Sequence, residues 1–337
     1  MDRMDAFDVL YRLAADDGRE ERLFGSCAPL AREVFAHCLI GDEMPIIWYE
    51  LPLAGEPRFD LHVALSRTAL AGDVAFAPGS GYGYDELFRW YSQSEQGGGG
   101  LAFAFDISEG RTTDPAVHVN VNNAPLNDID HFFELAGGAD APALYRDFTA
   151  QIPDDWHVWY AGTHPGRPGS HLRVDCFVGD AATDAYANDL SVFERDLRSV
   201  GFSAPLDALA MLATPILAQR GHLELQFDVL RDGSVGPTLG LSAGFPMARA
   251  SVLKPMFVDG EGAAILTAME ELGLADDRWR LIADAIYTKI IPAQDGAFAF
   301  YNIPTFIKLR MRDGAALDAK VYMQAGAQEL ESGGSSS

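Results

Sequence analysis

The sequence lacks the short motifs that mark several common classes of enzyme and metal-binding protein. Its three cysteines, Cys27, Cys38 and Cys176, are odd in number and show neither a CxxC pattern nor a Cys/His metal-binding spacing. No GxGxxG, P-loop, HExxH or GxSxG pattern stands in a strand-turn-helix setting. The cysteines are therefore interpreted as buried thiols in a reducing compartment.

Positive charge is also scarce. The chain has 25 lysine and arginine residues against 49 aspartate and glutamate residues, a formal net charge of −24 at pH 7. This balance argues against nucleic acid or an anionic membrane surface as a partner. The N-terminus, MDRMDAFDVL, lacks the basic region and apolar run of a signal peptide, and no apolar stretch is long and uncharged enough to span a bilayer. We expect a cytoplasmic protein.

Apolar residues, by contrast, are plentiful. They make up 48% of the 337 residues, which is enough to bury a substantial core. Length alone suggests about two domains, although barrels of this size often form one unit. We expect a single domain over residues 1–330 and a disordered tail over residues 331–337, which end in GGSSS.

Polar and apolar side chains alternate in several short segments, as is typical of β-strands with two different faces. In residues 171–178, His171, Arg173 and Asp175 share one face and the apolar residues between them share the other. For one strand, a polar face turned to water is the simpler interpretation. The alternation recurs, however, and its polar faces mix His, Asn, Gln, Arg and carboxylates, which predicts a shared interior. The other alternating segments are residues 58–64, 117–122, 222–228 and 306–312.

The order of the predicted elements favours a barrel. Pairs of helices alternate with antiparallel hairpins about five times, and such hairpins can close into a barrel of about ten strands with helices outside. The predicted fold is α+β, with a polar lumen. Predicted helices are residues 2–15, 28–39, 84–94, 128–135, 141–151, 184–199, 204–218, 262–272 and 278–290. Predicted strands are residues 45–53, 58–65, 101–105, 117–122, 156–162, 171–178, 222–230, 235–241, 297–312 and 316–324.

This α-β-β-α repeat resembles the prenyltransferase barrel, and within that group the sequence is similar to the cyanobactin-type peptide prenyltransferases. Three short patches carry the resemblance: YAG at residues 160–162 followed by SHLR at 170–173, the first hairpin with Glu50 and Arg58, and AKVY at 319–322. The resemblance implies transfer of a dimethylallyl or related isoprenyl group from its diphosphate to a side chain of a ribosomally synthesised peptide. A small aromatic acceptor and a non-catalytic ligand-binding barrel are the alternatives.

Cationic side chains on the strand faces that are predicted to turn into the lumen are candidates to hold the departing diphosphate. Charge-assisted hydrogen bonds from them would neutralise its developing charge. The resemblance implies this role for Arg58, Arg173, Lys320 and Tyr322, whereas Lys308 and Arg310 rest on strand phase alone. The other interpretation is that these cations pair with inward carboxylates. Asp60, Asp175, Glu224 and Asp228 are such carboxylates.

Glu50 is the candidate catalytic base. It interrupts the otherwise apolar segment IIWYELPL, in phase with Trp48. Partial burial is expected to raise its pKa toward the range of a proton acceptor, and the resemblance places an activating glutamate at a comparable position. A strand-end glutamate turned to solvent is the alternative interpretation.

The remaining candidates concern the prenyl and acceptor pocket and the metal. Aromatic ring faces can stabilise an allylic cation. The class I isoprenoid-synthase motif DDxxD is absent, and no metal site is predicted; the resemblance implies Mg²⁺ bound through the diphosphate with few protein ligands. The pocket candidates are Trp48, His62, Trp159, His171, Glu224 and Tyr301.

Overall fold

The computed structural model describes residue 12 and residues 18–29, 46–58, 60–65, 84–93, 100–105, 107–108, 111–112, 115–122, 124–164, 172–219, 222–293 and 296–330. Most of the two predicted N-terminal helices lies outside the described residues, as do Cys38, His171 and the tail at 331–337.

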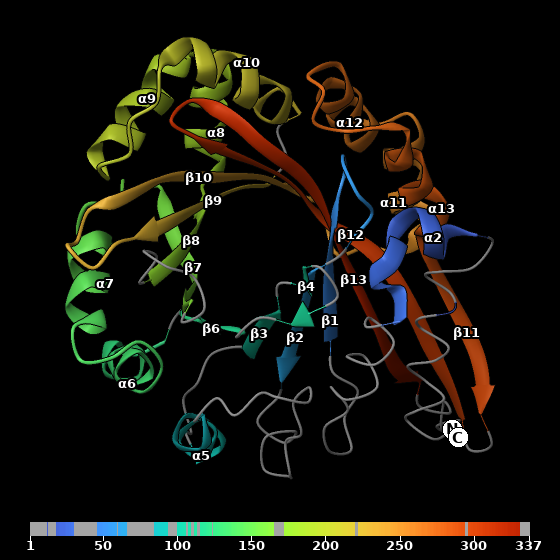
Figure 1. Ribbon diagram of the computed structural model, residues 1–337, viewed down its shortest axis with the longest axis horizontal. Coiled ribbons are helices and arrows are strands. Elements are labelled where there is room, and N and C mark those ends of the chain that lie inside the picture. Colours follow the sequence, from blue (N-terminus) through green and yellow to red (C-terminus); the bar gives the residue numbers. More distant parts are fainter. Residues whose placement is uncertain are drawn as a thin grey trace, which may run out of the picture.

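An antiparallel sheet closes on itself to form the centre of the molecule (Figure 1). Its ring runs β10-β9-β8-β7-β6-β3-β2-β1-β13-β12, and the pairing of β12 with β10 closes it. The predicted barrel of about ten strands is confirmed. The ring strands are β1 (Ile46–Pro52), β2 (Asp60–Leu65), β3 (Leu101–Phe105), β6 (Ala116–Asn120), β7 (Trp156–Thr163), β8 (Leu172–Val178), β9 (His222–Val229), β10 (Val235–Gly244), β12 (Gly296–Arg312) and β13 (Ala315–Leu330).

Three further strands lie outside this ring. β11 (Tyr287–Ala293) pairs with the first half of β12, while the second half of β12 pairs with β10. β4 (Ile107–Ser108) and β5 (Arg111–Thr112) form a separate two-stranded sheet. The long strand β12 therefore belongs to the ring in its second half and carries an added edge strand in its first.

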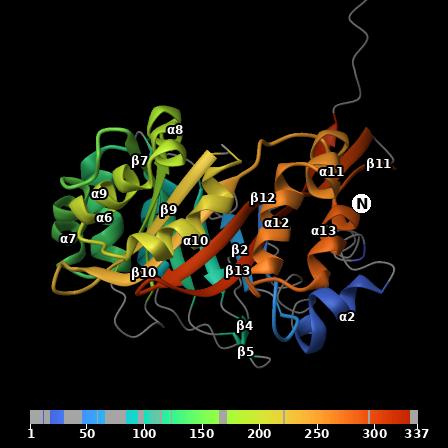
Figure 2. The ribbon, with the colours of Figure 1, turned by 90° about the horizontal axis from the view of Figure 1, so that it is seen from above.

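Helices surround the barrel (Figure 1). Seen from above, α10, α12 and α13 lie over the outer side of β10 and β12 (Figure 2). The helices are α2 (Arg19–Leu23), α5 (Asp85–Gln93), α6 (Leu126–Ala136), α7 (Ala141–Thr149), α8 (Asp180–Asn188), α9 (Leu190–Ser199), α10 (Leu206–Leu217), α11 (Ala250–Val258), α12 (Glu261–Glu271) and α13 (Arg280–Ala285), with short 3₁₀ turns at Gly25–Cys27 and Asp277–Trp279.

The outward face of the strands forms the hydrophobic core with these helices. On β8, Leu172, Val174 and Cys176 are all fully buried. On β9, the ring of Phe227 lies 5.5 Å from that of Phe148 on α7, measured between centroids. Burying each large apolar side chain contributes about 1.5–3 kcal/mol, so helix packing fixes which strand face turns outward. The alternate polar residues are thereby directed into the lumen.

A glycine permits close contact on the inner side of the ring. A Cβ atom at Gly162, the last residue of the YAG patch, would lie 2.4 Å from the carbonyl oxygen of Val117 and 2.6 Å from Nδ1 of His118. Any side chain there would displace β6 or the imidazole. The glycine in this patch therefore brings His118 against β7.

The helices differ from the prediction in four places, of which the first is α2, a helix between the predicted segments 2–15 and 28–39. The predicted helix over 184–199 is split at Asp189, whose side chain accepts a hydrogen bond from the Ser191 N–H and so caps α9. α11 was not predicted, because Pro255 interrupts its helical pattern. The helix predicted to reach residue 290 ends at Ala285, since the next residues pair with β12 as β11.

Two smaller observations bear on the sequence predictions. Cys27 and Cys176 are buried, unpaired thiols, as predicted. Within the described part of the chain, no helix has the length and apolar character needed to cross a membrane.

Candidate functional site

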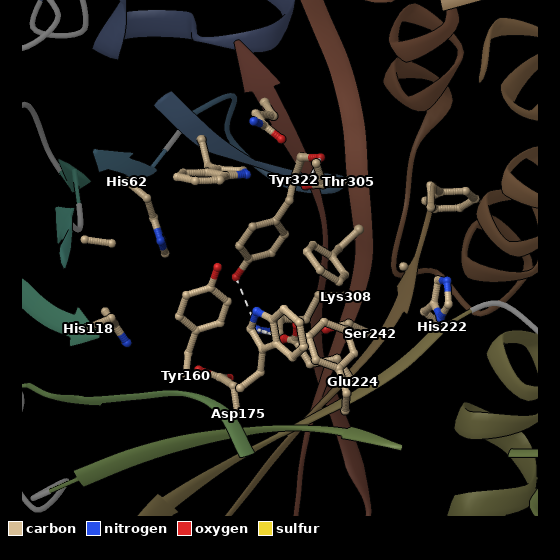
Figure 3. A pocket seen from close by; sticks show the side chains of 18 of the residues that line it. His62, His118, Tyr160, Asp175, His222, Glu224, Ser242, Thr305, Lys308 and Tyr322 are labelled. Carbon is tan, nitrogen blue, oxygen red and sulfur yellow. Dashed lines mark hydrogen bonds and ion pairs between the residues drawn. The ribbon is translucent and has the colours of Figure 1, made fainter. Parts of the chain in front are cut away.

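The lumen contains a cavity of about 780 Å³, within the usual range for small-molecule sites. Its walls come from the inward faces of strands around the ring, and Figure 3 shows their side chains converging on one space. The aromatic part of the lining comprises Trp48, Trp159, Tyr160, Phe177, Phe306 and Tyr322. The polar part includes His62, His118, Asp175, Glu224, Ser242 and Lys308.

The structure brings only some of the predicted site residues to the cavity. Two of the predicted diphosphate-binding residues line it, Lys308 and Tyr322, together with the pocket candidates Trp48, His62, Trp159 and Glu224. Arg58 precedes β2 and is exposed, away from the lining. Tyr301 is also outside the lining, although its hydroxyl accepts a hydrogen bond from Gln324, which lines the cavity. The other predicted residues that the structure describes, Glu50, Arg173, Arg310 and Lys320, are not among the lining residues and are held in ion pairs.

Glu50 belongs to a compact group that we call the Lys320 cluster: Glu50, Asp60, His62 and Lys320. Lys320 Nζ donates to Glu50 Oε2 and to Asp60 Oδ2, each at 2.8 Å. His62 Nε2 lies 2.5 Å from Glu50 Oε1. Direct contact with two proton-bearing groups satisfies the buried carboxylate.

The pKa of Glu50 follows from these contacts. Burial raises it, but Lys320 and then His62 together outweigh burial and hold it well below its ordinary value. The prediction of a raised pKa for Glu50 is therefore wrong. The local sequence of β1 shows no cation beside Glu50, but Lys320 on β13 lies next to its carboxylate in the folded barrel. The contacts with Lys320 and His62 thus favour the ionised form of Glu50.

The two lumen arginines are held by carboxylates. Arg173 donates from Nε and Nη2 to Oδ1 of Asp228, at 2.9 and 2.8 Å. Arg310 is bound through two nitrogens to Asp318, one of them Nε at 2.8 Å from Oδ1. For these two residues the structure agrees with the alternative interpretation, in which inward cations pair with inward carboxylates.

A second group, the Lys308 cluster, lines the cavity: Asp175, Glu224, Ser242 and Lys308. Lys308 Nζ is 3.8 Å from Glu224 Oε1, donates to the Tyr322 hydroxyl at 3.4 Å, and lies 5.0 Å from the centre of the Tyr322 ring (Figure 3). Burial raises the pKa of Glu224 to about 7 because Lys308 compensates only in part. Burial likewise raises the pKa of Asp175.

Sequence reasoning gave no binding role to several residues that line the cavity. The sequence pattern indicates Asp175 only as a partner for a cation, and it gives Ser242 no role. The signal for Ser242 is the alternation in β10, where Gly240, Ser242 and Gly244 separate the buried Leu241 and Ala243. Small residues on the inward phase of a strand indicate close approach by a neighbour.

Within the described residues, no group of three or more His, Cys, Asp or Glu side chains could hold a metal ion. These residues therefore do not form a magnesium site held by the protein itself, which would need several oxygen ligands in octahedral geometry.

Comparison with known proteins gives a likeness of fold. No model of a known protein family matches the chain, and no curated protein shows significant similarity to it. The crystal structure of AnaPT from Neosartorya fischeri is similar over 96% of this chain and 91% of its own, at 11% identity and a TM-score of 0.48. That of NotF in complex with brevianamide F and DMSPP is similar over 95% and 92%, at 10% identity and a TM-score of 0.46. The resemblance to the cyanobactin-type enzymes stays a prediction.

Proposed function

We propose that the protein transfers a prenyl group from an isoprenyl diphosphate to a small aromatic acceptor bound in the barrel lumen. One observation carries this proposal: the hydrogen-bonded pair of His62 and Glu50 opens onto a cavity with aromatic walls. Aromatic ring faces stabilise an allylic cation, and a positioned base removes the proton that the acceptor must lose. A peptide side chain entering the same cavity is the alternative acceptor.

His62 is the proton acceptor in this proposal, and Glu50 acts through it. An ionised carboxylate only accepts hydrogen bonds, so contact with Glu50 requires a proton on Nε2 of His62. The neutral imidazole then carries its lone pair on Nδ1. Glu50 orients the ring and stabilises the imidazolium that forms, so the role predicted for Glu50 becomes a positioning role.

Lys308 and Tyr322 are the groups that would contact the diphosphate, since both line the cavity. In the reaction, the bond between the allylic carbon and the diphosphate oxygen breaks with its electron pair leaving on the diphosphate. An acceptor carbon bonds to the allylic carbon, and the proton it loses passes to His62. Arg173, Arg310 and Lys320, which are not among the lining residues, would contribute positive charge to the lumen from a greater distance. Magnesium carried by the diphosphate remains a prediction, and no step is assigned to it.

A binding barrel without turnover is the second candidate. It is favoured by the pairing of Arg173, Arg310 and Lys320 with carboxylates at 2.8 Å, which reduces the positive charge available to a diphosphate.

The two candidates are separated by an assay of dimethylallyl diphosphate with aromatic and peptide acceptors, with and without Mg²⁺. We expect His62→Gln and Glu50→Gln to lower turnover about 100-fold or more while binding of the diphosphate persists. His131→Gln, on the exposed face of α6, is the matched control and should leave turnover unchanged.

Wild-type turnover in both variants would exclude the His62–Glu50 pair as the base. If calorimetry detects no binding of C5, C10 or C15 diphosphates, prenyl transfer is excluded and the binding barrel remains. A product formed with peptides alone would replace the small acceptor by a peptide.

A further inference from the structure

The charges that line the cavity do not balance. Among the described lining residues, the carboxylates are Asp175 and Glu224 and the Lys or Arg side chain is Lys308. Two negative charges and one positive charge leave a formal charge of −1 when the lining histidines are neutral. A buried carboxylate without a close cation is costly, so this excess indicates a missing positive partner.

The two carboxylates are neighbours on adjacent strands. Asp175 pairs in register with Gln226, and Phe177 pairs with Glu224. These are consecutive pairs on the inward face, so Asp175 and Glu224 are diagonal neighbours across β8 and β9. Asp175 accepts a hydrogen bond at 2.6 Å from the neutral amide of Gln226. Lys308 is 3.8 Å from Glu224, beyond hydrogen-bond distance. Neither carboxylate has the 2.8 Å contact to a lysine that Glu50 has.

Ser242 gives an independent sign of a ligand at the same place. Its side chain is fully buried and lines the cavity, and its Oγ has no hydrogen-bond partner among the described residues. It stands opposite Glu224 in the pairing of β9 with β10, and opposite Lys308 in the pairing of β10 with β12. Buried hydroxyls are nearly always hydrogen-bonded, so a ligand atom is the expected partner.

The chemistry of these groups selects an organic cation. The two carboxylates disfavour a phosphate between them, and Mg²⁺ would find no third His, Cys, Asp or Glu ligand beside them in the described part of the chain. An ammonium group has three donors, which match two carboxylates and a hydroxyl oxygen. The rings of Trp159 and Phe177, 5.2 Å apart at their centroids, line the same cavity and suit a cation or an aromatic ring.

We propose that Asp175, Glu224 and Ser242 form an ammonium-binding subsite, and that the acceptor is an arylalkylamine, an aromatic ring that carries a protonated aliphatic amine. This inference rests on the proposed function, because it names the acceptor class of the same lumen. The raised pKa values of Asp175 and Glu224 agree with it, since an ammonium ion would supply the charge compensation that Lys308 gives only in part.

The test is calorimetric binding without any diphosphate donor, so that it does not depend on turnover. Tryptamine is the cationic probe and tryptophol, with a hydroxyl in place of the amine, is the neutral one. We expect wild-type protein to bind tryptamine about tenfold or more tightly than tryptophol. Asp175→Asn and Glu224→Gln should each remove most of that preference, Glu224→Asp should keep part of it, and Ser242→Ala should weaken tryptamine about threefold.

Glu134→Gln, on the surface of α6, is the matched control for loss of a carboxylate and should leave the preference intact. Equal affinity for the two probes, no binding of either up to millimolar concentration, or a preference that survives both Asp175→Asn and Glu224→Gln would overturn the subsite. So would Mg²⁺ alone binding through the same two carboxylates with no amine preference.

The subsite and the proposed function fail in different ways. Amine preference without prenyl transfer in any acceptor assay supports the subsite and removes the proposed function. Prenyl transfer to neutral aromatics with no amine preference keeps the function and removes the subsite.

Discussion

The Lys320 cluster and the Lys308 cluster each combine one aspartate, one glutamate and one lysine, yet the pKa values of their glutamates shift in opposite directions. Lys320 contacts Glu50 and Asp60 at 2.8 Å, and the pKa of Glu50 is well below its usual value. Lys308 is 3.8 Å from Glu224, and the pKa of Glu224 is raised to about 7. Burial is similar in both, so direct contact with a cation decides the difference. In the Lys320 cluster, Lys320 lies at hydrogen-bond distance from both carboxylates. In the Lys308 cluster, Lys308 is farther from Glu224, so a cationic group of a ligand could supply the missing contact.

Removing the cation of the Lys320 cluster should have the largest effect. Lys320→Met leaves Glu50 and Asp60 buried without their ammonium partner, and we expect the free energy of unfolding to fall by about 3–5 kcal/mol. Urea denaturation at pH 7 measures this loss. The exposed Lys289→Met should change the value by less than about 0.5 kcal/mol. An equal effect of the two substitutions would show that the cluster is not an ionic unit.

Glu224→Gln should have the opposite effect, and only at high pH. Because the pKa of Glu224 in the folded state, about 7, lies above its ordinary value of 4.5, the folded state loses stability as pH rises from 4.5 to about 7. Replacing the carboxyl by an amide removes that loss, so the variant should gain about 3 kcal/mol at pH 8 and less than about 1 kcal/mol at pH 5. Denaturation curves at the two pH values test this; a gain independent of pH would contradict it.

Ser242→Ala should have the smallest effect. Its buried hydroxyl has no partner in the described residues, so removing it should raise the free energy of unfolding by up to about 1 kcal/mol. Thr183→Val is the contrast, because the Thr183 hydroxyl donates to the Gly179 carbonyl at 3.1 Å and its loss should destabilise. If both substitutions destabilise alike, Ser242 has a partner within the protein.

The alternation of residue types predicted much of the barrel. The predicted strand segments correspond to the ring strands, and the inward phase of His62, Glu224 and Lys308 agrees with the cavity lining. This works because helix packing on the apolar face fixes the orientation of the other face, whatever the strand order. The missed strand β11 shows the limit, since its pairing with β12 overrides a helical pattern.

Phase alone could not predict which inward residues reach the cavity. Arg173 and Arg310 have the predicted phase, but they are paired with Asp228 and Asp318 and are not among the lining residues. Glu50 has the predicted phase and the opposite pKa shift, because Lys320 lies 270 positions away in the chain. Those partners come from other strands, so they become neighbours only when the ring closes.

Local sequence predicted the ring strands, their two faces and the polar character of the lumen, because these depend on periodicity and on burial of apolar residues. The tertiary structure alone decided which carboxylate meets a cation at 2.8 Å and which faces the cavity with its charge uncompensated. The energy of a buried charge depends on contacts within a few ångströms. Closure of the barrel sets those distances.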